Sequence, residues 1–210
     1  MTAGTAEGFL FVRHGQTQDN VLGVRCGGDR DVPLTGRGLA DARAAAARLC
    51  ESGRPCGLVI AGPLQRTAVT GALFADALRV PLLEREWLRE RTLGAWNGLS
   101  IEDTRAWFAM GRTPPGGESE AAFAARVLAG VAGLADVIAR RPLLVGSKGV
   151  GRVLLHRLAG LPGVELGNCE IVAFERVASG AGDALPPDHW RWRCVRETES
   201  DLTELRLSRA

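Results

Sequence analysis

The chain has 210 residues, of which 46% are hydrophobic and 24% are charged, and these fractions are ordinary for a globular protein in water. The length predicts a single domain over residues 1–210. The formal net charge of +2 is too small to indicate a nucleic acid or an anionic membrane as a partner.

Strand-like and helix-like segments alternate along the chain. Buried strands are predicted at 8–13, 57–61 and 142–146, and further strands at 80–85, 170–177, 190–195 and 202–207. Helices are predicted at 35–50, from Pro63 onward, at 118–139 and at 148–158, with a loop at 112–117. This alternation predicts an α/β fold with a mostly parallel central sheet and helices on both faces.

The cysteines, the first residues and the longest apolar runs indicate where in the cell the protein is expected. The five cysteines form no CxxC pair, so we expect reduced thiols, a cytoplasmic protein and no zinc site. Residues 1–8 lack the basic region and apolar stretch of a secretion signal, and no run reaches the roughly 18 apolar residues of a membrane span.

The first predicted strand ends in Arg13-His14-Gly15, and ligands of open α/β sheets lie beyond the carboxyl ends of the strands. A neutral imidazole can attack phosphorus if its other nitrogen is held as a donor. The adjacent guanidinium offers several N–H donors to phosphate oxygens. Taken alone, however, the tripeptide favours an ordinary surface histidine after a strand.

Further segments accompany this tripeptide. In chain order they are FLFVRHGQTQDN (9–20), GGDRDVPLTGRG (27–38), AGPLQRTAVT (61–70), LRERTLGAWNGL (88–99), PPGGES (114–119) followed by Arg126, and LLVGSKGVGRVLL (143–155). Together they resemble the sequence blocks of the histidine phosphatase (phosphoglycerate mutase-like) superfamily, in the family's order and over most of the chain. The resemblance implies a phosphoglycerate mutase-like fold.

The resemblance also implies a mechanism. His14 would be the nucleophile and form a phosphohistidine, while Arg13 and Arg66 would bind the phosphoryl oxygens. Glu90 would protonate the leaving oxygen, although the neighbouring charges also allow it to belong to a solvated charge run. Asn20 corresponds to a polar residue of the family's site and could equally cap a turn. No metal or cofactor is implied, because arginines and backbone amides would neutralise the phosphate.

One departure falls on the last block. The position of the family's second catalytic histidine holds Ser147, and the first of the two glycines that usually follow is Lys148. A serine hydroxyl can donate to phosphate without adding charge, and Lys148 could restore that charge. Alternatively, Ser147 is an ordinary helix cap and Lys148 points into solvent. A smaller departure is Asn97, where the family often has an acid.

The sequence therefore predicts a hydrolase of a small soluble phosphate monoester, with activity that is atypical or reduced. The alternatives are a non-catalytic phosphate-ester binder and a family member with different chemistry at the same site. A mutase is less favoured, because the chain is short on the insertions of the longer mutases. The stretch GSKGVG (146–151) lacks the glycine order of a nucleotide-binding loop.

Overall fold

The computed structural model describes residues 7–177, 191–197 and 202–204, so positions 190 and 205–207 of the predicted strands lie outside it. Seven strands form one sheet in the order β3-β2-β4-β1-β5-β6-β7. The strands are β1 (Gly8–Arg13), β2 (Val59–Ala61), β3 (Leu82–Glu84), β4 (Leu143–Gly146), β5 (Ile171–Val177), β6 (Arg191–Glu197) and β7 (Leu202–Glu204).

The four strands β3, β2, β4 and β1 run parallel to one another. The α/β fold with a mostly parallel central sheet and helices on both faces is confirmed. The structure adds an antiparallel extension, because β5 pairs antiparallel with β1, and β6 and β7 continue in that manner. The pairing of β5 with β1 brings the beginning of β5 to the edge where β1 ends.

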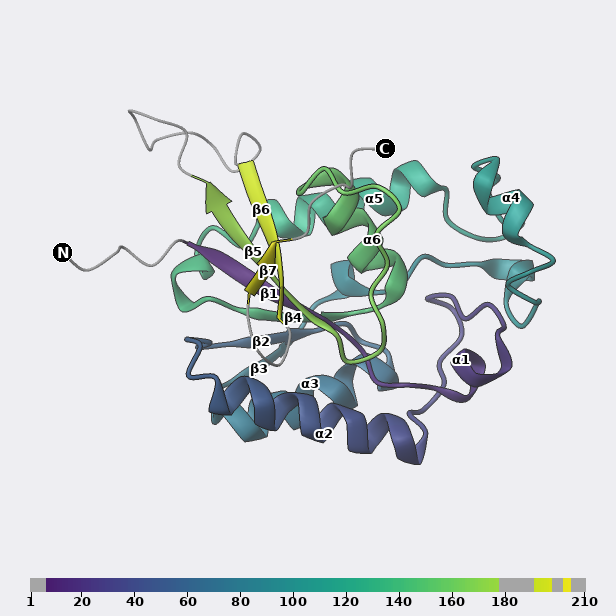
Figure 1. Ribbon diagram of the computed structural model, residues 1–210. Helices are drawn as coiled ribbons and strands as arrows, with labels where there is room; N and C mark the ends of the chain where they lie inside the picture. Colours follow the sequence, from purple (N-terminus) through teal and green to yellow (C-terminus); the bar gives the residue numbers. More distant parts are fainter. Residues whose placement is uncertain (1–6, 178–190, 198–201, 205–210) are drawn as a thin grey trace.

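Helices cover both faces of this sheet (Figure 1). The α-helices are α1 (Gln18–Leu22), α2 (Gly36–Glu51), α3 (Gln65–Leu78), α4 (Arg105–Ala109), α5 (Glu120–Ala132) and α6 (Lys148–Arg157). Three short 3-10 helices are η1 (Glu86–Leu88), η2 (Gly94–Trp96) and η3 (Ile138–Arg140). Figure 1 places α2 and α3 on one face, and α5 and α6 on the other.

The side chains of β1 alternate between two cores, as expected for a strand buried on both faces. Phe9 and Phe11 pack with apolar residues of α5 and α6. Leu10 and Val12 pack with alanines and Phe74 of α2 and α3. Burial on both faces fixes the strand rigidly, and the residues that follow Arg13 begin from a well-anchored end.

Two predicted helices have different limits in the structure. The helix predicted at 118–139 is α5, which begins only after Ser119, whose hydroxyl accepts a hydrogen bond from the Ala122 N–H. It ends at the C-cap Gly133, and the turns that follow bury Leu134 and Ile138 in the core. The helix expected from Pro63 is α3, which begins two residues later at Gln65. In the described part of the chain, no helix has the length and hydropathy to cross a membrane.

Candidate active site

The carboxyl ends of β1 and β4 lie side by side. Arg13 is the register partner of Gly146, and the His14 N–H donates to the Gly146 carbonyl at 2.9 Å. His14 and Ser147 therefore follow directly from neighbouring parallel strands. The sheet brings these two residues together although more than half of the chain separates them.

His14 is 4% exposed, and its Nδ1 lies 2.7 Å from the Gly15 carbonyl oxygen. A carbonyl can only accept, so Nδ1 carries the proton and Nε2 keeps its lone pair. Burial, followed by the charges of Arg66 and Arg13, holds the pKa of His14 well below its ordinary value, against the opposing effect of the Gly15 bond. The Gly15 N–H is itself fixed by Thr70 Oγ1 at 3.1 Å. The imidazole is thus neutral, oriented and suited to nucleophilic attack.

Two arginines accompany His14. Arg13 donates through Nη1 to the Leu166 carbonyl at 2.8 Å, and its buried Nε has no acceptor among the described residues. Arg66, in the first turn of α3, is 1% exposed. It donates to the carbonyls of Arg30 at 2.9 Å and Gly27 at 3.1 Å. A guanidinium has five N–H donors, so both arginines keep donors for an anion.

Glu90 is anchored to the first turn of α6. Its Oε2 accepts from the Gly149 N–H at 2.8 Å, and its Oε1 accepts from the Arg91 N–H at 2.7 Å. A Cβ at position 149 would lie 2.1 Å from Oε1, so only a glycine allows this approach. Glu84 and Arg85 are exposed while Glu90 is half-buried. Glu90 therefore does not belong to a solvated charge run, and its charge acts on Arg13.

Ser147 occupies the N-cap position of α6, but its side chain makes no capping hydrogen bond. The residue is 1% exposed, and its hydroxyl has no partner within the described residues. Lys148 forms an ion pair with Glu165 at 2.8 Å. The prediction that Ser147 is an ordinary helix cap is therefore wrong, because its hydroxyl forms no capping hydrogen bond. The Lys148 side chain is 45% exposed, but it is ion-paired and does not simply point into solvent. His156 is exposed in the last turn of α6.

Asn20 is linked to His14 by Asn168, a residue that the sequence analysis did not single out. The Asn168 Nδ2 donates to the His14 carbonyl at 2.8 Å and to Asn20 Oδ1 at 3.2 Å. Asn20 also completes the capping box of α1, accepting from the Thr17 N–H at 3.1 Å, so the predicted capping role is present as well. Asn168 and Leu166 belong to no motif, and only the antiparallel pairing of β5 brings them to this edge.

The residues between β3 and α5 include a cluster of aromatic side chains. Trp96 contacts Trp107 and Phe108, with ring centroids 5.1 and 5.3 Å apart, and the Arg25 guanidinium lies 3.9 Å from the Phe108 centroid. The side chain of Asn97 accepts from the Gly27 N–H at 2.7 Å. The aromatic residues thus pack together, and Asn97 ties this segment to the loop that carries Gly27.

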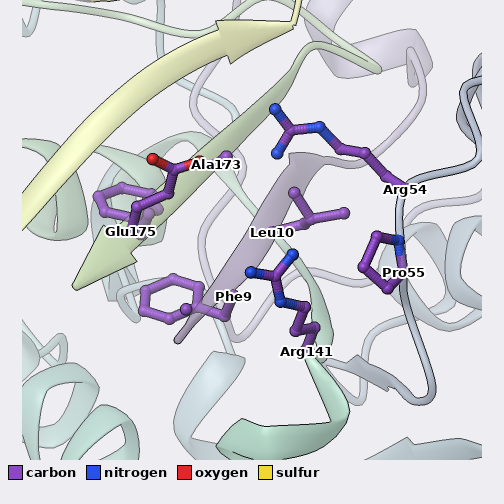
Figure 2. Close-up of a pocket in the computed structure, with 9 residues that line it drawn as sticks. Phe9, Leu10, Arg54, Pro55, Arg141, Ala173 and Glu175 are labelled. Atoms are coloured by element: carbon purple, nitrogen blue, oxygen red, sulfur yellow. The ribbon is translucent and has the colours of Figure 1, made fainter. Parts of the chain in front are cut away.

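A separate depression lies at the opposite end of β1 (Figure 2). It holds about 290 Å³ of space, part of it open to solvent, and is lined by Gly8, Phe9, Leu10, Arg54, Pro55, Arg141, Ala173, Phe174 and Glu175. The residues predicted to carry the chemistry do not contribute to it. They gather instead where β1 and β4 end.

Comparisons with known proteins agree with this geometry. The model of the histidine phosphatase superfamily (branch 1) matches residues 9–181. A 2,3-bisphosphoglycerate-dependent phosphoglycerate mutase of Methylobacterium radiotolerans is 33% identical over 178 residues, covering 77% of this chain and 84% of that protein.

Solved structures give the same result. A mycobacterial glucosyl-3-phosphoglycerate phosphatase in complex with VO3 has a TM-score of 0.75 at 26% identity, covering 90% of this chain and 97% of that one. The α-ribazole phosphatase of Shigella flexneri has a TM-score of 0.67 at 25% identity, covering 80% and 90% respectively. By the matched family model and by these likenesses, the chain belongs to the histidine phosphatase superfamily.

Proposed function

We propose that the protein hydrolyses a small soluble phosphate monoester through a phosphohistidine formed on His14. The observation that carries this proposal is the state of the imidazole, which is buried, neutral and protonated on Nδ1, with its Nε2 lone pair available. The buried Nε of Arg13 and hydroxyl of Ser147 still need acceptors. The oxygens of a phosphoryl group would supply them.

The proposed reaction has two steps. Nε2 of His14 attacks phosphorus, the P–O ester bond breaks, and the leaving oxygen takes a proton from Glu90, which has to enter this step as the protonated carboxyl. Water then attacks the phosphohistidine, the P–N bond breaks, and the Glu90 carboxylate receives the proton. Arg13 and Arg66 bind the phosphoryl oxygens in both steps and stabilise the charge of the transition state.

Ser147 sets the expected rate. We infer that it stands where relatives carry a second histidine, and that its hydroxyl donates to a phosphoryl oxygen. Loss of one charged donor costs about two to three orders of magnitude in rate, so hydrolysis should be slow. The same substitution favours a second candidate, a phosphate-ester binder without turnover, while the intact His14 and Glu90 favour catalysis.

The first test is an assay of phenyl phosphate hydrolysis. It measures the release of phosphate and the amount of labelled phosphoprotein that can be trapped. We expect slow turnover by the unchanged protein and a loss of at least about 10³-fold in His14→Ala. His156→Ala, which removes an exposed histidine of α6, is the matched control and should keep full activity. Ser147→His should raise the rate.

One result would decide against hydrolysis. If the unchanged protein and Ser147→His neither release phosphate nor become labelled, His14 is not a phosphoryl acceptor for this ester. Titration with inorganic phosphate then tests the second candidate, because a binder retains affinity that depends on Arg13 and Arg66.

A further inference from the structure

The segment between α6 and β5 contributes a carboxylate to the edge of the candidate phosphate site, by which we mean Arg13, His14, Arg66 and Ser147. Leu166 in this segment accepts the Arg13 hydrogen bond at 2.8 Å, and Glu165 directly precedes it. Burial lowers the pKa of Arg13, and the charges of Glu90 and then of Glu165 oppose that effect. The Glu165 carboxylate thus acts electrostatically on a guanidinium expected to bind phosphate.

The same carboxylate holds the only lysine of the chain. Lys148 Nζ lies 2.8 Å from Glu165 Oε2, and Lys148 follows Ser147 directly. The two side chains are 45% and 61% exposed, and ion pairs so exposed to water contribute little stability. A stronger anion near Ser147 could therefore replace Glu165 as the partner of Lys148.

The interior of the site is short of acceptors in the described structure. The Ser147 hydroxyl is buried and has no partner, and the Arg13 Nε is in the same condition. His14 is neutral and adds no charge. A phosphate dianion bound to the Ser147 hydroxyl would lie beside Lys148, the next residue in the chain. The flexible four-carbon stem of a lysine allows its ammonium group to change partner.

We propose that Glu165 is an internal counterion that holds Lys148 at the edge of the site, and that a bound phosphoryl group replaces Glu165 as the partner of Lys148. This inference rests on the phosphate site of the proposed function, but it requires binding alone and no turnover. Lys148 would then add positive charge only when phosphate is bound, and Glu165 would set the affinity for that anion.

A double-mutant cycle on phosphate affinity tests the exchange. Isothermal titration calorimetry at low ionic strength would give the Kd for inorganic phosphate of four proteins: the unchanged protein, Glu165→Gln, Lys148→Met and the double variant. We expect Glu165→Gln to lower the Kd by about fivefold, the scale of one exposed ion pair. Lys148→Met should raise the Kd, and Glu165→Gln should lower the Kd by a smaller factor in Lys148→Met than in the unchanged protein, because only its direct effect on Arg13 then remains.

Glu102→Gln is the matched control, because Glu102 is exposed and ion-paired with Arg105. It should leave the Kd unchanged and thereby exclude a general effect of removing one negative charge. The inference is overturned if Glu165→Gln leaves the Kd unchanged, if its effect is equally large in Lys148→Met, or if neither the unchanged protein nor Glu165→Gln binds phosphate. A complete cycle without any hydrolysis would instead retain the exchange and reject the hydrolase.

Discussion

Replacing Gly149 by alanine perturbs the candidate general acid without touching its side chain. The Gly149 N–H, in the first turn of α6, donates to Glu90 Oε2 at 2.8 Å. An alanine Cβ would lie 2.1 Å from Oε1 and 2.9 Å from Oε2, whereas ordinary contact begins at 3.4 Å. The Glu90 carboxylate is the free end of a side chain, so it has to retreat by about 1.3 Å, the difference between 2.1 and 3.4 Å.

This displacement is large enough to disable proton transfer. A misplacement of about 1 Å can cost about 10²-fold in rate, and general acid catalysis contributes about 10²–10⁴-fold in total. We therefore expect kcat/KM for phenyl phosphate to fall about 10²-fold in Gly149→Ala. 4-Nitrophenyl phosphate, whose leaving group needs little protonation, should lose less than about tenfold.

Stability should respond differently from activity. Alanine is favoured over glycine in helices by about 1 kcal/mol, which offsets loss of the hydrogen bond to Glu90, so the free energy of unfolding in urea should change little. Gly36→Ala is the control, because Gly36 begins α2 with open space around its Cβ position. If Gly149→Ala has the same kcat/KM on phenyl phosphate as the unchanged protein, the acid role of Glu90 is refuted.

Three further outcomes can be measured by urea unfolding. The pKa of His14 is lowered in the fold, so unfolding takes up a proton below the ordinary pKa of about 6.5. As the pH falls below this value, the free energy of unfolding should decrease by up to about 1.4 kcal/mol per pH unit more than in His14→Gln. Equal pH slopes for the two proteins would contradict a neutral His14. Thr70→Val leaves the buried Gly15 N–H without its acceptor and should cost about 1–3 kcal/mol, whereas an unchanged stability would mean that water replaces the hydroxyl. Asn168→Ala removes the donor to His14 and Asn20 and should cost about 1 kcal/mol for each lost bond; no loss would show that these contacts are dispensable.

The elements that the sequence predicted most accurately carry their own local signals. The strand β1 has the predicted limits, since an unbroken apolar run has to be buried on both faces. The helix predicted at 35–50 is α2, and Thr35 is its N-cap, accepting from the Gly38 N–H. The shorter α5 could not be predicted, because its end depends on where Leu134 and Ile138 enter the core.

Some residues of the candidate site could likewise be placed from the sequence, and others could not. His14 and Ser147 could be placed at strand ends from the sequence, and the register of β1 with β4 confirms that they lie together. Lys148 could be placed at the start of α6, but its pairing with Glu165 could not be predicted. The segment of Glu165 and Asn168 carries no motif, and its position depends on the antiparallel pairing of β5 with β1.

The amino-acid sequence was enough to indicate which residue types could carry phosphoryl chemistry and on which elements they lie. Strand burial, helix caps and the order of motifs depend on residues close together in the chain, so a linear pattern records them. The tertiary structure alone decided that Glu90 meets Gly149, 59 residues away, and that Asn168 meets His14, 154 residues away. Such contacts depend on strand order and direction, which are set by burying both sheet faces at once.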